Sequence, residues 1–230
     1  MKIVWMLCAF SLASISAFSQ NEAALVKAVK AKLDKVKDYK AAANMRIDVS
    51  FINAPASEVT VYYKKPNQFA VKKQNGISIL PKGGVSINMS TLLSSDNYAV
   101  VPSGNAIVKG YATKVVKLLP LDDAGDVVLT TLYIDEKALL VRKSTVTTKE
   151  SGTYDMELDF GKYAAWGLPD KVVFLFTAKD YKLPKGITFE YEKGGAPKTP
   201  TDKNKKGKVE LSYTAYTINK GVSDAVFKEK

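Results

Sequence analysis

The sequence predicts a single α+β domain in which an N-terminal amphipathic helix covers part of a many-stranded β-sheet. Three observations predict this fold class: one long helical pattern near the start of the chain, many short strand patterns separated by turn residues, and almost no second long helix. Parallel strands need crossovers of a dozen or more residues, usually helical. The sheet is therefore expected to be mostly antiparallel.

The first residues have the pattern of a secretory signal peptide. Lys2 precedes an apolar run, and small residues stand at Ala17 and Ser19. The run is shorter than the roughly 20 apolar residues of a membrane-spanning helix. We expect residues 1–19 to be cleaved after about Ser19 and residues 20–230 to fold as one domain in the periplasm.

Composition excludes several kinds of chemistry. The chain has no histidine, and its single cysteine, Cys8, lies in the leader, so Ser-His and Cys-His nucleophile systems and the usual zinc sites are not expected. We predict no catalytic residue, metal or cofactor, and no enzyme activity. The formal net charge of +11 favours anionic lipid head groups or acidic partners, or serves as a lysine-rich solubilising surface. Export argues against a nucleic-acid partner.

Each element has its own pattern along the chain. Apolar residues recur at three- and four-residue steps over residues 21–39, which predicts the amphipathic helix. Alternation over residues 45–51 predicts the first strand, and residues 54–56 are expected to turn the chain. Further strands are predicted at 58–63, 69–73, 77–80, 85–89, 98–101, 106–108, 115–119, 127–134, 139–147, 153–160, 171–177, 187–191 and 208–218.

The segments between the strands complete the prediction. Short helices are expected at residues 90–95, 161–166 and 223–227, as parts of a lid. Residues 193–207 are rich in Gly, Pro and Lys and lack periodicity, which predicts a basic flexible loop. This loop is either simply solvated or in contact with membranes or acidic proteins.

Two strand patterns, at residues 127–134 and 172–176, are apolar on both faces rather than one. At roughly 25 cal/mol per Å², an exposed apolar face of several hundred Å² costs several kcal/mol, so something must cover it. One outcome is a barrel packed solid by its own side chains. The other is a part-open barrel with the helix as lid over an apolar pocket, and the pattern does not separate the two.

The segment KKPNQF, residues 64–69, follows the strand pattern VTVYY. Pro66 and Asn67 fit the centre of a turn, which places Lys65 at the edge of the sheet and Phe69 at the start of the next strand. On local grounds this is either an ordinary hairpin or the rim of a ligand pocket.

The order of leader, helix, strand, VYYKKPNQFAV and closing strands with VELSYTAYTIN resembles the periplasmic outer-membrane lipoprotein carrier family, the LolA-like proteins. In that family a strand is followed by a basic residue, Arg-Pro-Asn and, one step on, an aromatic residue. The resemblance implies a half-barrel, lidded by helices, whose apolar interior takes the acyl chains of lipoproteins. Lys65 takes the place of the family's arginine, which is tied to lid closure and hand-over.

The resulting functional hypothesis is an exported, monomeric carrier that binds the acyl chains of lipids or lipoproteins, for outer-membrane lipoprotein sorting, with transient contacts to membrane or envelope proteins. Lys65 is expected at the polar head of the ligand. Alternation of the strands predicts that the chains contact Ile47, Val49, Phe51, Val61, Tyr63, Phe69 and Val71. The alternatives are an envelope regulatory or sensory module that binds proteins with the same half-barrel, and a structural protein with a solid barrel.

Overall fold

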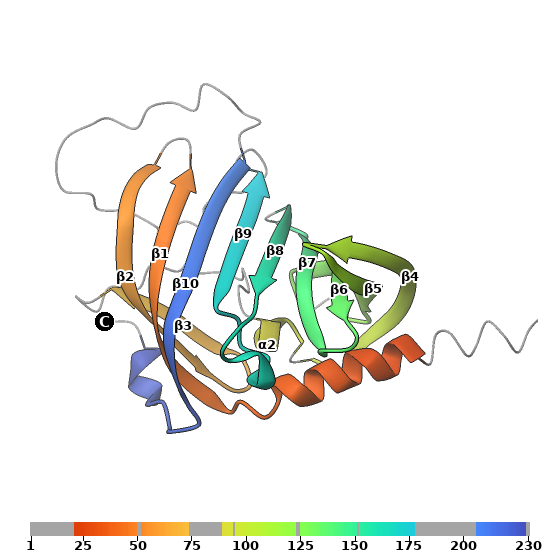
Figure 1. Cartoon of the computed structure of the whole chain (residues 1–230), viewed down its shortest axis with the longest axis horizontal. Coiled ribbons are helices and arrows are strands. Elements are labelled where there is room, and N and C mark those ends of the chain that lie inside the picture. Colours follow the sequence, from red (N-terminus) through yellow and green to blue (C-terminus); the bar gives the residue numbers. More distant parts are fainter. Residues whose placement is uncertain are drawn as a thin grey trace, which may run out of the picture.

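The computed structural model describes residues 21–49, 52–73, 89–93, 95–122, 125–150, 152–177 and 206–228. These residues contain a helix over residues 21–33, a short second helix, two 3₁₀ turns and ten strands (Figure 1). The strands are β1 (Asp38–Val49), β2 (Ile52–Lys64), β3 (Gln68–Lys73), β4 (Tyr98–Val108), β5 (Tyr111–Pro120), β6 (Val127–Asp135), β7 (Leu140–Thr148), β8 (Thr153–Asp159), β9 (Lys171–Thr177) and β10 (Lys206–Ile218). The short helical elements are α2 (Met89–Leu92), η1 (Ala164–Trp166) and η2 (Asp224–Val226).

All ten strands belong to one antiparallel sheet with the order β3-β2-β1-β10-β9-β8-β7-β6-β5-β4. Strand β10 returns to the middle of the sheet and pairs with both β9 and β1. Strands β3 and β4 are the two edges, and no pairing joins them within the described residues. Figure 1 shows the sheet arching with the N-terminal helix across its lower end. The predicted half-barrel with a helix is confirmed.

The N-terminal helix packs one face on the sheet. Leu25, Val26, Val29 and Leu33 recur at helical spacing and are all buried. The helix ends at residue 33, so the predicted extension to residue 39 is wrong. The last residues of that prediction instead turn and begin β1, because pairing with β2 and β10 outweighs their local helical pattern.

The predicted turn at residues 54–56 is also wrong, because β2 continues through it. The register of β1 against β2 shifts between Met45 and Ile47, which forms an irregularity opposite Pro55. A bulge accommodates proline inside a sheet because the missing N–H is not needed for the ladder there.

Strand β4 joins the two strands predicted at residues 98–101 and 106–108. Its register against β5 shifts between Pro102 and Asn105, and Gly104 between them has a φ of 84° that favours glycine. Beyond this irregularity, Lys109 at the hairpin tip contacts the carboxylates of β8, at 3.1 Å from Glu157 and 2.9 Å from Asp159.

Two apolar clusters fill the side of the sheet that faces the N-terminal helix. The helix cluster contains Leu25, Val26, Val29, Leu33, Met89, Leu93, Val116, Leu118, Leu132, Ile134, Val141, Val146, Tyr154, Met156, Leu158, Val172, Phe174 and Phe176. The tyrosine cluster contains Val36, Tyr39, Ala41, Ala43, Met45, Val59, Val61, Tyr63, Val71, Leu168 and Leu211. The N-terminal helix thus covers the β5–β9 part of the sheet, and the tyrosine cluster lies beside it on β1–β3.

The short helices at residues 90–95, 161–166 and 223–227 are confirmed as α2, η1 and η2, each shorter than predicted. Several predictions lie outside the described residues. These are the leader at 1–19, the strands at 77–80 and 187–191, and all but the last residue of the strand at 85–89, whose Met89 begins α2 instead. Residues 193–205 of the predicted loop also lie outside, and residues 206 and 207, predicted as loop, belong to β10. No helix in the described part of the chain has the length and hydropathy to cross a membrane.

Candidate functional site

Four of the predicted ligand-contacting residues lie together on β2 and β3. The register pairs Val61 with Val71 and Tyr63 with Phe69, so the four side chains form one patch on two neighbouring strands. Val61, Tyr63 and Val71 are fully buried in the tyrosine cluster, and Phe69 packs against it at partial exposure. A ligand would reach the three buried side chains only if the elements that cover them move.

A more accessible position lies where the two clusters meet. Ile47, Val209 and Tyr213 are partly buried and pack against both the helix cluster and the tyrosine cluster. They occupy adjacent strands, because Ile47 on β1 pairs with Val209 on β10. We call these three residues the junction. Ile47 was predicted from the alternation of its strand, whereas the side chain of Val49 and the whole of Phe51 lie outside the described residues.

Sequence reasoning missed the β10 side of the junction. Val209, Leu211 and Tyr213 alternate with polar residues, and this period-two signal marks the inner face of β10. The pattern was present, but only the return of β10 to β1 brings these side chains beside Ile47.

Five tyrosines lie in the tyrosine cluster or pack against it. The ring centroids of Tyr39 and Tyr63 lie 5.4 Å apart, those of Tyr39 and Tyr216 5.2 Å, and those of Tyr213 and Tyr216 5.0 Å. Tyr163 meets Tyr216 edge to face with a centroid distance of 4.8 Å. Burial raises the pKa of Tyr63 to about 12, and the pKa values of Tyr39, Tyr213 and Tyr216 are also raised by burial. The phenols of these four residues are therefore neutral at physiological pH, which suits an apolar ligand with few polar groups.

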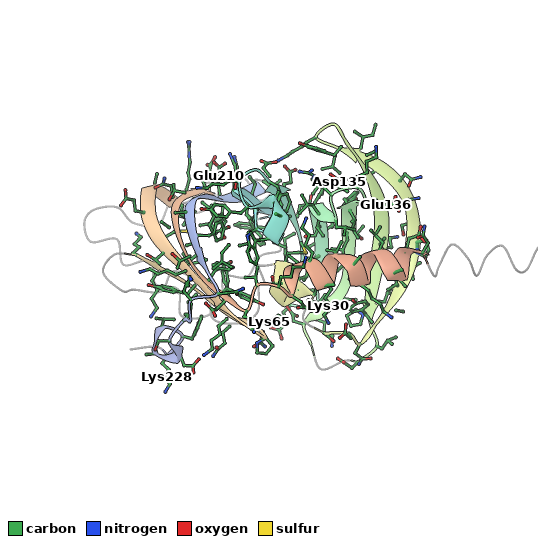
Figure 2. All side chains as sticks on the ribbon, turned by 60° about the horizontal axis from the view of Figure 1, so that its bottom comes forward. Lys30, Lys65, Asp135, Glu136, Glu210 and Lys228 are labelled. Carbon is green, nitrogen blue, oxygen red and sulfur yellow. The ribbon has the colours of Figure 1, made fainter. Side chains whose placement is uncertain are left out.

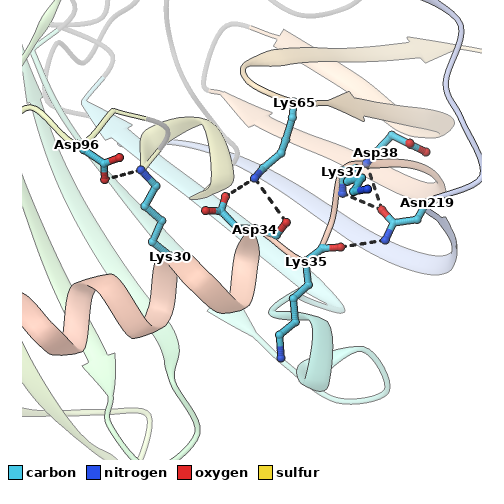
Figure 3. Close-up of polar contacts among 8 residues, drawn as sticks. All are labelled: Lys30, Asp34, Lys35, Lys37, Asp38, Lys65, Asp96 and Asn219. Carbon is cyan, nitrogen blue, oxygen red and sulfur yellow. Dashed lines mark hydrogen bonds and ion pairs between the residues drawn. The ribbon is translucent and has the colours of Figure 1, made fainter.

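The segment KKPNQF forms the predicted turn between β2 and β3. The Lys65 ammonium pairs with the Asp34 carboxylate just after the N-terminal helix and also donates to the Asp34 carbonyl at 3.4 Å (Figure 3). The Lys65 backbone N–H donates to the Lys37 carbonyl at 2.9 Å. The turn is thus a hairpin that is tied to the helix end, and Asp34 is close enough to contribute to the raised pKa of Tyr63.

Other contacts hold the C-terminal end of the helix. Lys32 Nζ donates to the Ala138 carbonyl at 2.7 Å, in the turn between β6 and β7. The Asn219 amide donates to the Lys35 carbonyl at 2.9 Å and accepts from the Lys37 N–H at 2.7 Å (Figure 3). The helix is therefore attached at its end to three separate parts of the sheet. Figure 2 turns the bottom of Figure 1 forward and shows Lys30 on the helix and Lys65 near the end of the helix.

A buried ion pair joins β6 to β7. Arg142 Nη2 contacts Asp135 Oδ2 at 2.7 Å, and the guanidinium carbon lies 3.6 Å from the centre of the Tyr111 ring. Burial alone would raise the pKa of Asp135, but the hydrogen bonds from Arg142 and from the Ala138 N–H hold it below the usual value. In the described residues there is no group of three or more His, Cys, Asp or Glu side chains that would hold a metal ion.

Comparison with solved structures defines the class of fold. A domain from Vibrio parahaemolyticus, described as an outer membrane lipoprotein-sorting protein, aligns with a TM-score of 0.55 at 9% identity over 89% of this chain and 95% of its own. A DUF1329 family protein from Desulfovibrio piger aligns with a TM-score of 0.55 at 10% identity, over 91% and 97%. A LolA superfamily protein from Nitrosomonas europaea gives 0.54 at 9% identity, over 89% and 97%.

These likenesses place the chain in the fold class of the LolA-like half-barrels. The resemblance first seen in KKPNQF therefore extends to the fold of the described chain. No protein-family model matches the sequence, and no curated protein matches it. At 9 to 10% identity the structural matches define the fold, while the ligand has to be argued from this chain's own residues.

Proposed function

We propose that this protein is a carrier that binds the acyl chains of lipids or lipoproteins, non-covalently, on the inner face of its half-barrel. The observation that carries the proposal is the junction: Ile47, Val209 and Tyr213 connect two apolar clusters yet remain partly exposed. A packed protein core normally has no such half-covered seam in its middle. A flexible apolar chain would cover the seam and contact both clusters.

The energy available from such binding is large. Each buried CH₂ contributes about 0.8 kcal/mol, so a chain of about sixteen carbons contributes on the order of 10 kcal/mol before the costs of association. Polar contacts are needed only at the head of the ligand. Lys65 and the N-terminal helix lie at the end of the sheet that is lowest in Figure 1 and is turned forward in Figure 2. A polar head group would remain in water there.

The same proposal covers location and mode of action. The signal-peptide pattern at the start of the sequence and the lipoprotein-sorting description of one protein with this fold support work in the bacterial envelope. We propose a monomeric carrier rather than an enzyme, with transient contacts to membranes or envelope proteins. It would take up acyl chains when the helix end and the β2–β3 turn separate, which uncovers Val61, Tyr63 and Val71.

The test is displacement of a fluorescent fatty acid from purified protein carrying a polar substitution at the junction. Ile47→Asn is expected to weaken binding by about 10-fold or more, because an amide would lie unpaired against the chain. Arg46→Asn, the exposed neighbour on the opposite face of β1, is the matched control and should bind as the wild type does.

Val209→Thr keeps the test informative if Ile47→Asn fails to fold, because threonine has nearly the shape of valine. It should weaken binding less than Ile47→Asn does but more than Arg46→Asn does. Equal binding by all the folded variants, or no binding of the probe by the wild type, would overturn the proposed function.

A further inference from the structure

A groove separates the N-terminal helix from the edge strand β4. Its volume is about 780 Å³, within the range of small-molecule sites. It is lined by Ala23, Lys27, Lys30, Ala31, Asp34, Asp96, Tyr98 and Val100. Tyr98 and Val100 also pack against the helix cluster, so the apolar wall of the groove is the edge of the inner face of the sheet.

The charges in the groove leave one lysine in excess. Asp34 is paired with Lys65, and Asp96 is paired with Lys30 at 2.5 Å (Figure 3). Lys27, one turn before Lys30 on the same side of the helix, has no ion pair or hydrogen bond among the described residues. The groove therefore offers a free ammonium group beside an apolar wall.

The pair between Lys30 and Asp96 is unequal. The Lys30 side chain is only 15% exposed, so the groove holds its ammonium in place, whereas the Asp96 side chain is 80% exposed. A carboxylate so exposed contributes little to an ion pair. An incoming oxyanion can therefore replace Asp96 at small cost and contact Lys27 and Lys30 together.

We propose that the groove binds the anionic head group of an amphiphile, with Lys27 and Lys30 on the oxyanion and the start of the acyl chain against Tyr98 and Val100. Burial raises the pKa of the Tyr98 phenol, although the nearby positive charge of Lys30 opposes this shift. The Tyr98 O–H therefore remains available as a hydrogen-bond donor. This inference rests on the proposed function, because the chain continues from the groove onto the inner face of the sheet. It adds the charge of the ligand, which the apolar clusters do not specify.

The experiment compares two short-chain lipids that differ only in their head groups, dihexanoyl phosphatidylglycerol and dihexanoyl phosphatidylcholine. Each is used below its micelle concentration to displace a fluorescent fatty acid from the full chain. The wild type should prefer phosphatidylglycerol by about 5-fold, as expected for one or two partly exposed charge contacts. Lys27→Gln should reduce this preference, and the double variant with Lys30→Gln should abolish it. Because phosphatidylcholine carries the same phosphate together with a cationic choline, its affinity should fall less than the affinity for phosphatidylglycerol.

Two further variants sharpen the test. Asp96→Asn removes an exposed competitor for Lys30 and should increase the preference for phosphatidylglycerol, which a structural defect would not do. Lys40→Gln, an exposed lysine on β1 away from the groove, is the control and should leave the preference unchanged.

The outcomes separate this inference from the proposed function. Equal displacement by the two lipids, with the probe still bound by the wild type, overturns the groove and leaves the carrier standing. If inorganic phosphate or an acidic peptide, at the concentration used for phosphatidylglycerol, removes the preference for phosphatidylglycerol, the inference is also overturned, because neither competitor needs the apolar wall. Failure of the probe to bind at all contradicts the proposed function instead.

Discussion

Replacing Lys65 by Gln tests whether its ion pair with Asp34 acts as a latch between the β2–β3 turn and the helix end. The two side chains are 36% and 43% exposed, and a pair this exposed contributes about 0.2 to 1 kcal/mol. Losing it should raise the open population, and with it the rate of ligand release, by about 1.5- to 5-fold. The melting temperature of a domain of this size should fall by at most about 4 °C.

Lys64→Gln is the matched control for this latch. Lys64 is also 36% exposed and also forms an ion pair, at 2.6 Å, but with Asp224 in η2 rather than with the helix end. Stopped-flow release of a fluorescent fatty acid and thermal unfolding are measured for both variants. We expect faster release from Lys65→Gln alone, with similar melting temperatures. Wild-type release rates in both variants, or an equal loss of stability and binding in Lys65→Gln, would refute the latch.

Two further substitutions probe the packing of the fold. Asp135→Asn leaves the Arg142 guanidinium buried without its carboxylate, and urea unfolding at pH 7 should show a loss of about 3 to 5 kcal/mol. The pKa of Asp135 is lowered in the folded state, so its contribution to stability is present above the unfolded pKa of about 3.9 and is lost as the pH falls below that value toward the folded pKa. The free energy of unfolding of Asp135→Asn should therefore change less between neutral and acid pH than that of the wild type. Parallel pH profiles for the two proteins would contradict the pairing. Gly207→Ala would place a Cβ atom 2.3 Å from the Phe176 ring and should cost about 1 to 3 kcal/mol in the same assay. At Gly125 an added Cβ atom would have its nearest neighbour at 4.0 Å, so Gly125→Ala should leave the free energy of unfolding almost unchanged. If Gly207→Ala is as stable as Gly125→Ala, the Phe176 ring moves aside freely.

The strands could be predicted well because their signals are local. A short apolar run bounded by turn residues predicted residues 171–177 as a strand, and β9 has the same bounds. The errors fall where distant pairing decides the structure. The end of the helix and the start of β1 depend on β10, far along the chain, and Val128, predicted as apolar on a covered strand, is 47% exposed beside a register shift in β6.

The candidate site was predictable in part for the same reason. The turn at Lys65 and the patch on β2 and β3 follow from a hairpin whose strands are adjacent in sequence. The partner of Lys65, Asp34, and the junction residues Val209 and Tyr213 come from elements that meet only in the folded sheet. No spacing within the sequence indicates those contacts.

Organic extraction of the protein purified from the envelope of cells that produce it, followed by mass spectrometry, shows whether acyl chains occupy the half-barrel. We expect acyl-bearing species in amounts close to one per protein molecule, and less of them from Ile47→Asn. Protein that is consistently empty, at a sensitivity well below one ligand per molecule, would contradict the claim that the inner face of the half-barrel holds acyl chains.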